Sequence, residues 1–559
     1  MSNPQHVSVL ILGSNPSAQL LAWLLAKRGI SIRLLPGEKE PSAPAELLLH
    51  ARSLELLDQA GAADEFKKIG SPVERSLFLK FDENEIQELG RSIFSVLESP
   101  HPFALSTTIE QVSKTCETLL KQVGIEYEQE TNLEDFQQTA DGINCRLNKG
   151  SLTCDYLVAC DGSDSSVRKK LSIPNTSSGK KNYVQTARLS LTTDSPKLNP
   201  VEALLFFQPD QQLAVYPRGE TELCCVSVAD TEKADLKFTL EKLQKQFDLL
   251  SKNSPLPKIR LADITANEHF QHQNYLAEKF ASNRTFLLGS AAHNTAAPLL
   301  LDDLNSGIED VFNLVWKLTN AIQTNSAPPL LSSYHTERQQ SLRQKLETAR
   351  RAIPTNKSAL ASPASWLAEK ITPTMNREQW FLLHSHIEFA GLDQHYTLSK
   401  TFAFEIPPQK AANQIAGKRL PNMELCRQDG QLCPIYNYLA PDHFTLFLFV
   451  NSPHPAESAP LQQAEQFAEV LLHILGKKLR ILFVLPAKTF MLLQNKKTNE
   501  PATGEILIDR IGLTSDALGL LKGGACLVRP DGIIGLLSKS LDPAHTRLRL
   551  LRFLSTAKR

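Results

Sequence analysis

Apolar runs, glycines and helical spacing follow one another at the start of the chain. The mostly apolar run 7–12 meets Gly13, the stretch 17–28 has helical spacing, and Gly29 precedes a second apolar run at 30–35. This pattern predicts a strand, a helix that ends at Gly29, and a second strand. In that order of elements, the N-terminus of the helix is suited to bind a dinucleotide.

The same patterns predict further elements along the chain. Helical spacing covers 50–66, where we expect the helix to end near Gly61, and it covers 107–123 and returns around 307–319. Apolar runs typical of strands occupy 143–147, 156–160 and 285–289. Between 180 and 270 the residues alternate as in a sheet, with a charged helix near 235–250. Helices then dominate to about residue 390, and a loop rich in Pro, Gln and Asn at 406–416 predicts a linker. After the linker, strands and helices alternate as in an α/β domain.

The totals restrict the classes of protein and partner. A chain of 559 residues is too long for a single core, so we expect roughly two to four domains. Sixty basic residues balance sixty acidic ones, which argues against nucleic acid or an anionic membrane as a partner. The longest apolar runs, such as 444–450, are too short to span a bilayer.

The cysteines indicate a reduced setting. Nine are present, without the spacing of metal ligands and without a C-x-x-C pair, so we expect no metal site. No secretory signal stands before Gly13. We therefore expect a cytoplasmic protein.

The first turn keeps part of the usual dinucleotide-binding sequence. Where G-x-G-x-x-G is expected, the chain has GSNPSA. Gly13 permits the tight bend and Ala18 is a small third residue, whereas the side chain of Asn15 stands where phosphates approach. Pro36 replaces the acid that binds ribose, and Glu38 could substitute only if the loop bends back. Two interpretations stay open for this segment, namely a nucleotide site or a simple packed strand–helix unit.

Three stretches together resemble one family. They are the first turn, YLVACDGSDSSVRKKL (156–171) and RTFLLGSAAH…LNSGIEDVFNLVWKL (284–318). YHTER (334–338) and further landmarks within 417–535 follow in the same order. The chain resembles the single-component FAD-dependent aromatic hydroxylases of the phenol hydroxylase and polyketide hydroxylase types.

The resemblance implies an α/β fold in three parts. A doubly wound, Rossmann-like FAD-binding domain would comprise 1–180 and 275–400 and would end in a helical part. A mixed-sheet substrate domain would be inserted over 181–274. A thioredoxin-like domain would occupy 410–559, without C-x-x-C and therefore without disulfide exchange. NAD(P)H would be a transient co-substrate without a domain of its own.

The resemblance also implies which residues meet FAD. Carried over position by position, they are Gly13, Asn15, Ala18, Arg52, Thr107, Asp161, Gly162, Gly289, Ser290 and Asn305. Thr107 stands in place of a glutamine, and Ser290 stands in place of a carboxylate. Arg52 lacks the family's second arginine, and a plain surface charge is the alternative. For the pair Asp161-Gly162 the alternative is an ordinary turn that ends a strand.

The largest departure from the family follows His293. Where the family has a glycine-rich loop against the flavin ring, the chain has PLLLDD at 298–303. The leucines need space and the aspartates oppose negative charge, so a hydrophobic plug in an emptied site is the alternative to a working loop. We interpret His293 as structural and the aromatic residues of 180–270 as core. No catalytic base is identified.

Two functions are compatible with these residues. The first is an FAD- and NAD(P)H-dependent monooxygenase that hydroxylates an aromatic or polyketide-like small molecule. The second is a flavin-free pseudoenzyme of the same fold that acts as a binding or scaffolding partner, for example of a true hydroxylase. A homodimer is a further option. The sequence identifies neither the substrate nor a preference for NADH or NADPH, and fold alone does not choose between the two functions.

Overall fold

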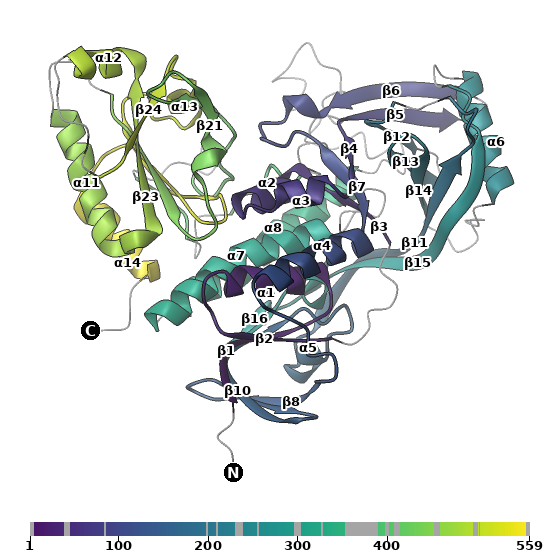
Figure 1. The fold of residues 1–559 in the computed structure, drawn as a ribbon, viewed down its shortest axis with the longest axis horizontal. Coiled ribbons are helices and arrows are strands. Elements are labelled where there is room, and N and C mark those ends of the chain that lie inside the picture. Colours follow the sequence, from purple (N-terminus) through teal and green to yellow (C-terminus); the bar gives the residue numbers. More distant parts are fainter. Residues whose placement is uncertain are drawn as a thin grey trace.

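The structure is a computed structural model of the chain that describes residues 5–37, 45–82, 85–196, 199–207, 211–229, 239–253, 257–295, 303–325, 328–352, 390–396, 402–406, 414–451, 459–495, 501 and 503–554. Within these ranges the strands form four sheets, of seven, eight, eight and three strands. Figure 1 shows the three larger sheets in different parts of the molecule, with the long helices α7 (Asp303–Thr324) and α8 (Pro328–Ala352) between the C-terminal part and the rest.

The N-terminal sheet is built on four parallel strands. In order across the sheet they are β17 (Thr285–Leu287), β10 (Gly150–Ala159), β1 (Gln5–Leu12) and β2 (Ile32–Leu35). The short β16 (Ala281–Ser282) and the antiparallel β9 (Ile143–Leu147) and β8 (Leu133–Gln138) extend it. Helix α1 (Pro16–Ala26) connects β1 to β2 and packs against α4 (Ile109–Gln122) and α7. All the residues of α1 from Pro16 to Leu25 are buried, which places this βαβ unit inside the largest hydrophobic core.

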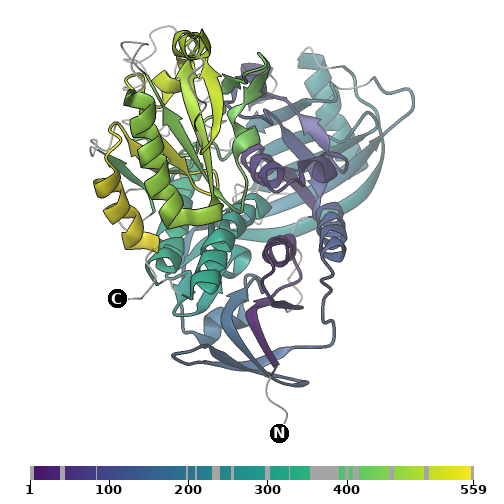
Figure 2. The same ribbon diagram turned by 60° about the vertical axis from the view of Figure 1, so that its left-hand side comes forward.

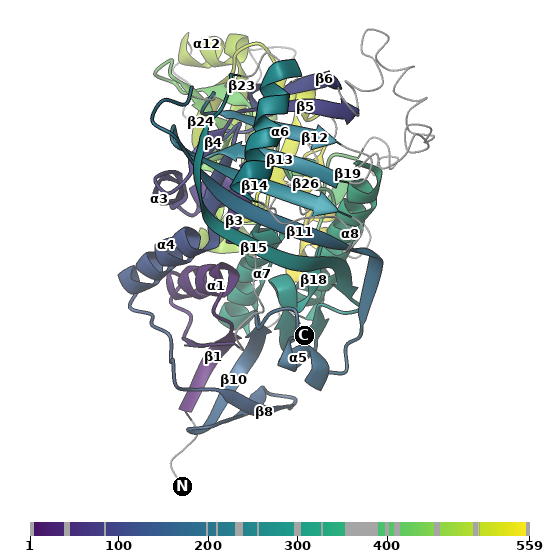
Figure 3. The same ribbon diagram turned by 90° about the vertical axis from the view of Figure 1, so that its right-hand side faces the viewer.

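The second sheet accounts for the alternation between 180 and 270. Its order is β18-β15-β11-β14-β13-β12-β5-β6. The strands are β5 (Arg75–Asp82), β6 (Glu85–Ile93), β11 (Asn175–Leu191), β12 (Glu202–Phe207), β13 (Gln211–Pro217), β14 (Glu222–Ala229), β15 (Leu261–Ala277) and β18 (His293–Asn294). Tyr216 and Cys224 lie in one buried cluster, whereas Val215 and Cys225 lie in another, as the two-residue period of a strand requires. Helix α6 (Leu240–Asn253) covers the second cluster, and Figure 3 shows it across that face of the sheet.

A three-stranded sheet corrects one expected helix boundary, and two helices occupy 50–66. The sheet consists of β3 (Glu46–Leu49), β7 (Ala104–Thr108) and β4 (Ser71–Val73). The helix expected over 107–123 begins later, because Thr107 belongs to β7 and the Thr108 hydroxyl caps α4 by accepting from the Gln111 N–H at 3.1 Å. Within 50–66, α2 (Ala51–Gln59) ends just before Gly61, which has φ +75°, close to where the sequence predicts the end of the helix, and a short second helix, α3 (Ala63–Lys67), follows.

The C-terminal part is a separate α/β unit. Its sheet has the order β19-β26-β25-β22-β23-β24-β20-β21. The strands are β19 (Phe404–Ile406), β20 (Glu424–Cys426), β21 (Leu432–Pro434), β22 (Phe444–Phe449), β23 (Leu479–Pro486), β24 (Glu505–Asp509), β25 (Gly524–Val528) and β26 (Ile534–Ser538). The helices of this unit are α11 (Ala459–Leu475), α12 (Ala487–Asn495), α13 (Leu513–Ala517) and α14 (Pro543–Leu554). The N-terminal part has one further short helix, α5 (Ser166–Lys170). Figure 2 shows α11 beside α14, and α14 also contacts α8.

These sheets confirm the predicted fold class. The second sheet also contains β5 and β6, although both strands lie within 1–180, the range expected for the FAD-binding domain. The expected domain boundaries stay a prediction. Residues 353–389 of the expected helical region and 407–413 of the expected linker lie outside the described residues. Among the helices that are described, none combines the length and the apolar character that crossing a membrane requires.

Candidate cofactor site

Four parallel strands end side by side at one edge of the N-terminal sheet. Leu12 pairs with Leu35 on one side and with Ala159 on the other, and Ala159 pairs with Leu287. The residues that leave the sheet together at this edge are Gly13, Pro36, Cys160, Asp161, Leu288 and Gly289. In open α/β sheets, ligands bind at the carboxyl ends of the strands.

Glycines let the segments at this edge lie close together. Gly13 has φ +147°, and a Cβ there would lie 2.3 Å from the carbonyl oxygen of Cys160. A Cβ at Gly307, in the second turn of α7, would lie 2.5 Å from Ser17 Oγ of α1. Both positions therefore require glycine for close packing, and the start of α1 lies against β10 on one side and α7 on the other.

Asn15 caps the N-terminus of α1 with its own side chain. Its Oδ1 accepts a hydrogen bond from the Ala18 N–H at 3.1 Å, and its Nδ2 donates to the Cys160 carbonyl at 2.8 Å. The backbone at Asn15 is extended, with φ −100° and ψ 166°, so this position does not use the positive φ that asparagine tolerates. Ala18 is fully buried. The helix start, which would otherwise attract an anion, thus already holds an internal acceptor.

Asp161 is a buried carboxylate with one unused oxygen. Its Oδ2 accepts from Ser166 Oγ at 3.2 Å and from the Val167 N–H at 3.3 Å, while Oδ1 has no hydrogen-bond partner among the described residues. Only 6% of Asp161 is exposed. A Cβ at Gly37 would lie 3.2 Å from Asp161 Cα, so the turn after Pro36 packs directly over this residue. Gly162 follows at φ +87°, and Glu38 lies outside the described residues.

The turn after β17 is held by a buried carboxylate on α7. Asp310 Oδ2 accepts from the Gly289 N–H at 3.0 Å and contacts His293 Nε2 at 2.7 Å. Burial alone would raise the pKa of Asp310, but His293 and Arg338 outweigh it and lower that pKa below its ordinary value. The carbonyl oxygen of Ser290 accepts from the Tyr275 hydroxyl at 2.5 Å.

His293 has the structural surroundings that the sequence analysis assigned to it. It is buried, bonded to Asp310 and stacked on Phe280 with ring centroids 5.8 Å apart. Most of the PLLLDD segment that follows lies outside the described residues, which resume at Asp303, so the expected plug stays a prediction.

Arg168 connects two of the turns. Its Nη1 donates to the Ala291 carbonyl at 2.7 Å and its Nη2 donates to the Ser163 carbonyl at 2.6 Å. One guanidinium therefore fixes the segment after Asp161 relative to the segment after Gly289.

Three of the predicted cofactor contacts have partners elsewhere in the protein. Asn305 Oδ1 accepts from the His50 N–H at 2.9 Å and from Ser53 Oγ at 2.7 Å, which ties the first turn of α7 to α2. The Thr107 hydroxyl donates to the Ile69 carbonyl at 2.9 Å. The other seven predicted residues lie at the strand ends, in the turns that leave them or, for Ala18, in the first turn of α1. For all ten, contact with FAD stays a prediction.

Arg52 is the third of these residues, and it points to the C-terminal part. The interpretation as a surface charge does not apply, because only 2% of Arg52 is exposed. Its Nη1 pairs with Glu55 at 3.0 Å, and its Nη2 donates to the Asp531 carbonyl at 2.5 Å. Glu55 also pairs with Arg419 at 3.0 Å.

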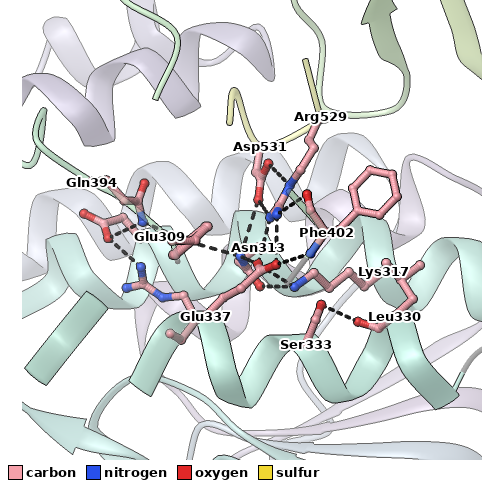
Figure 4. A network of polar contacts seen from close by, with 12 residues as sticks. Glu309, Asn313, Lys317, Leu330, Ser333, Glu337, Gln394, Phe402, Arg529 and Asp531 are labelled. Atoms are coloured by element: carbon pink, nitrogen blue, oxygen red, sulfur yellow. Dashed lines mark hydrogen bonds and ion pairs between the residues drawn. The ribbon is translucent and has the colours of Figure 1, made fainter. Parts of the chain in front are cut away.

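A second set of buried charges joins α7 and α8 to the C-terminal part (Figure 4). Glu337 accepts from Lys317 Nζ at 2.8 Å and from both Nη atoms of Arg529 at 2.9 and 2.8 Å. Arg529 also pairs with Asp531, and Asn313 Nδ2 donates to Glu337 at 2.7 Å. Lys317, Glu337 and Arg529 are all inaccessible to solvent.

The sequence analysis assigned no role to the residues that organise this edge. Arg168 and Arg338 lie inside stretches that it quoted only for the family resemblance, 156–171 and 334–338. A signal was present for Asp310 and Lys317, because they share a face of α7 whose neighbouring residues are apolar and buried. A charge at such a position predicts a buried ionic partner.

The residues at the strand ends fit a flavin dinucleotide in two respects and compete with it in one. Gly13 allows the tight turn between β1 and α1 that a dinucleotide site requires, and Asp161 Oδ1, which has no partner among the described residues, can accept from a ligand hydroxyl or N–H. Asn15 competes, because its Oδ1 takes the Ala18 N–H. Within the described ranges, no group of three His, Cys, Asp or Glu residues is arranged to hold a metal ion.

Comparisons with known proteins agree with this architecture. A Bacillus subtilis protein named as an uncharacterized aromatic compound monooxygenase is 27% identical over 450 residues, which cover 78% of this chain and 84% of the relative. The pentachlorophenol 4-monooxygenase of Sphingobium chlorophenolicum is 23% identical and covers 94% of this chain and 93% of its own. The crystal structure of the flavin-dependent monooxygenase PieE, in complex with FAD and substrate, superposes with a TM-score of 0.71 at 20% identity over 98% of this chain and 99% of PieE.

The family assignment rests on a match longer than half of the chain. The profile described as "FAD binding domain" matches residues 6–349, a span that contains every strand end and turn described above. The chain therefore belongs to the FAD-binding-domain family.

Proposed function

We propose that this protein is an FAD- and NAD(P)H-dependent monooxygenase that hydroxylates an aromatic or polyketide-like small molecule. The observation that carries the proposal is the row of four strand ends around the start of α1, with Gly13 packed against Cys160 and with a buried Asp161 oxygen that no described residue bonds. The names of the relatives, an aromatic compound monooxygenase and a pentachlorophenol 4-monooxygenase, support the class of reaction and substrate.

The chain's own residues would bind and orient the cofactor. The diphosphate would lie at the start of α1 beside Gly13 and Ser17, where the helix N-terminus favours negative charge. Asp161 would accept a hydrogen bond through Oδ1, and the turn at Gly289, which lies next to Ser17, would border the diphosphate from the side of β17. FAD bound there would supply the redox chemistry, with NAD(P)H as the source of the hydride.

The proposal also gives each part of the chain a role. Residues 1–180 and 275–400 would hold FAD, and 181–274 would cover the substrate. The sheet face that points away from α6, which includes Phe78 and Tyr216, would be the one turned towards the substrate. Residues 410–559 would form a structural domain.

A second candidate is favoured by particular contacts at the same edge. Asn15 occupies the start of α1 internally, and Arg52 is bonded to Glu55 and Asp531. Pro36 offers no acceptor where a ribose-binding acid would stand. These three features favour a flavin-free pseudoenzyme that acts as a binding or scaffolding partner.

The visible spectrum of the purified full-length protein, followed by titration with FAD, distinguishes the two candidates. The monooxygenase would carry the absorption of bound flavin or acquire it on titration. FAD at 100 times its dissociation constant would stabilise the fold by about 2.7 kcal/mol, which raises the melting temperature. Oxidation of NADPH or NADH with oxygen uptake, in the presence of phenolic and polyketide test compounds, then tests the reaction. A colourless protein whose melting temperature FAD does not change would support the pseudoenzyme.

A further inference from the structure

The segment YHTER (334–338) lies within α8, and its side chains contact three parts of the molecule. The Tyr334 hydroxyl donates to the carbonyl of Leu287, the last residue of β17, at 2.8 Å. Glu337 receives Arg529 from the C-terminal part. Arg338, one residue further, turns towards the first turns of α7.

Arg338 is a fully buried guanidinium with three acceptors. Its Nε donates to Asp310 Oδ1 at 2.6 Å, its Nη1 donates to Glu309 at 2.7 Å, and its Nη2 donates to the Ser306 carbonyl at 3.0 Å. Because a guanidinium is planar and always charged, these bonds fix the plane of the Asp310 carboxylate.

The other oxygen of Asp310 faces the turn after β17. Oδ2 accepts from the Gly289 N–H at 3.0 Å and bonds to His293 Nε2 at 2.7 Å. Gly289 stands at φ +60°, and a Cβ there would lie 3.7 Å from Ser17 Oγ, so this turn directly borders the start of α1. A rotation of the carboxylate would therefore release the turn beside the proposed diphosphate site.

We propose that Arg338 is a positioning residue of the cofactor site, which acts through Asp310 to hold the Gly289 peptide and the His293 ring in place. The inference rests on the proposed function in so far as the turn at Gly289 borders FAD. It gives the YHTER segment a task that the sequence analysis left open.

The test compares full-length Arg338→Met, Arg338→Lys, Asp310→Asn and the double variant Arg338→Met/Asp310→Asn. Lys317→Met is the matched control, since it removes a buried cation from the same helix pair without touching Asp310. Two quantities are measured: hydrogen exchange in peptides that span 285–295 in protein without added FAD, and the dissociation constant of FAD.

Arg338→Met and Asp310→Asn are each expected to accelerate exchange in 285–295 and to weaken FAD binding about tenfold. The double variant is expected to match Asp310→Asn, because both residues act through one path. Arg338→Lys keeps the positive charge but not the planar set of guanidinium donors. Its exchange rate in 285–295 and its dissociation constant for FAD should lie between those of the wild type and Arg338→Met. Lys317→Met should lower the melting temperature and leave both quantities at the wild-type value.

Additive losses in the double variant would overturn the proposal, as would unchanged exchange at 285–295 in Arg338→Met. If the wild-type protein itself does not bind FAD, the proposed function fails, and the exchange measurement still decides whether Arg338 holds the turn.

Discussion

The side chain of Asn15 determines which backbone N–H groups at the start of α1 are available to a ligand. Its carboxamide satisfies one N–H of the helix and one carbonyl of β10, so both polar atoms of the side chain are engaged within the protein. A diphosphate at this turn must therefore compete with an internal ligand instead of meeting an unpaired donor. The effect of this one residue on affinity can be measured directly.

Asn15→Gly is expected to tighten FAD binding about fivefold, because it frees the Ala18 N–H at the helix start. Glycine at an N-cap costs the helix only a few tenths of a kcal/mol relative to asparagine, so the fold should persist. Quenching of flavin fluorescence gives the dissociation constant. Asn15→Asp serves as the control, since it keeps the acceptor and adds a negative charge, and it should weaken binding. Equal affinities for the glycine variant and the wild type would show that the cap does not compete.

Gly13 tests the packing of the same turn. Gly13→Ala would bring a Cβ within 2.3 Å of a backbone oxygen that cannot move aside, and it should lower the free energy of unfolding by at least about 1–3 kcal/mol. Gly61→Ala is the control, because it also has positive φ but no atom within 4 Å of the added Cβ. It should cost about 1–2 kcal/mol from backbone strain alone. Denaturant unfolding of both variants measures the difference, and equal losses would contradict the close packing at Gly13.

At the scale of elements, α7 and α8 are joined by charges rather than by apolar contacts alone. Burial lowers the pKa of Lys317 to about 8, although Glu337 acts against this shift. Burial would raise the pKa of Glu337, but Arg529 and Lys317 outweigh it, so that this pKa lies far below its ordinary value of 4.5. Such a group is ionised in the folded protein at every ordinary pH, and its stabilising effect depends on that charge.

Acid should therefore weaken the contact between α7 and α8. A carboxyl whose pKa is lowered by folding binds fewer protons in the folded than in the unfolded chain, so the free energy of unfolding falls as the pH drops below about 4.5, by up to about 1.4 kcal/mol per pH unit for each such group. Glu337→Gln should cost about 3–5 kcal/mol at neutral pH and show a smaller acid slope. Urea unfolding between pH 3 and pH 7 measures both effects.

The exposed Glu110, which pairs with Lys114, provides the control for this experiment. Glu110→Gln should leave both the stability and the slope close to those of the wild type, because solvent screens the pair. A Glu337→Gln variant with the wild-type slope would contradict the role of the buried carboxylate.

Elements with a strong apolar period could be predicted from the sequence, whereas half-exposed strands could not. The strand and helix expected over 7–12 and 17–28 are present as β1 and α1, since nearly every residue there is buried. The 17-residue strand β15 carries no clear alternation of apolar residues, because much of it faces solvent and it is held by backbone pairing with β11. Backbone pairing depends on residues far away in the chain, which local patterns do not report.

The same limit applies to the site. The turns at Gly13, Asp161 and Gly289 could be located because each follows an apolar strand. The roles of Arg168 and Arg338 could not, since both depend on partners on other elements, Ala291 and Asp310. The sequence also could not reveal that Arg52 turns to Asp531, 479 residues later in the chain.

At the scale of the whole molecule, the C-terminal part is held to the FAD-binding family core by buried ion pairs. Arg529 reaches Glu337 on α8, while Asp531 and Arg419 meet α2 through Arg52 and Glu55. These contacts come from two separate segments of the C-terminal part, so its position on the core is fixed at more than one point. We expect the two parts to unfold together.

Arg529→Met tests that cooperativity. The substitution would leave Glu337 and Asp531 without their shared cation, and it should lower the free energy of unfolding by about 3–5 kcal/mol. Calorimetry is expected to show one unfolding transition for the wild type and two for the variant, as the C-terminal part separates from the core. Arg480→Gln, which breaks a half-exposed pair with Glu505 inside the C-terminal sheet, should cost about 0–1 kcal/mol and keep a single transition. Two transitions in the wild type would contradict the coupling.

The self-capped start of α1 has a consequence for the life of the protein in a cell. In a newly synthesised chain the Ala18 N–H can bond to Asn15, so this turn can fold before FAD binds. Loading would exchange one bond for another and add little net stability at this point. The fraction of molecules that carry flavin should then follow the cellular supply of FAD, and riboflavin starvation should leave the amount of polypeptide unchanged while its colour is lost.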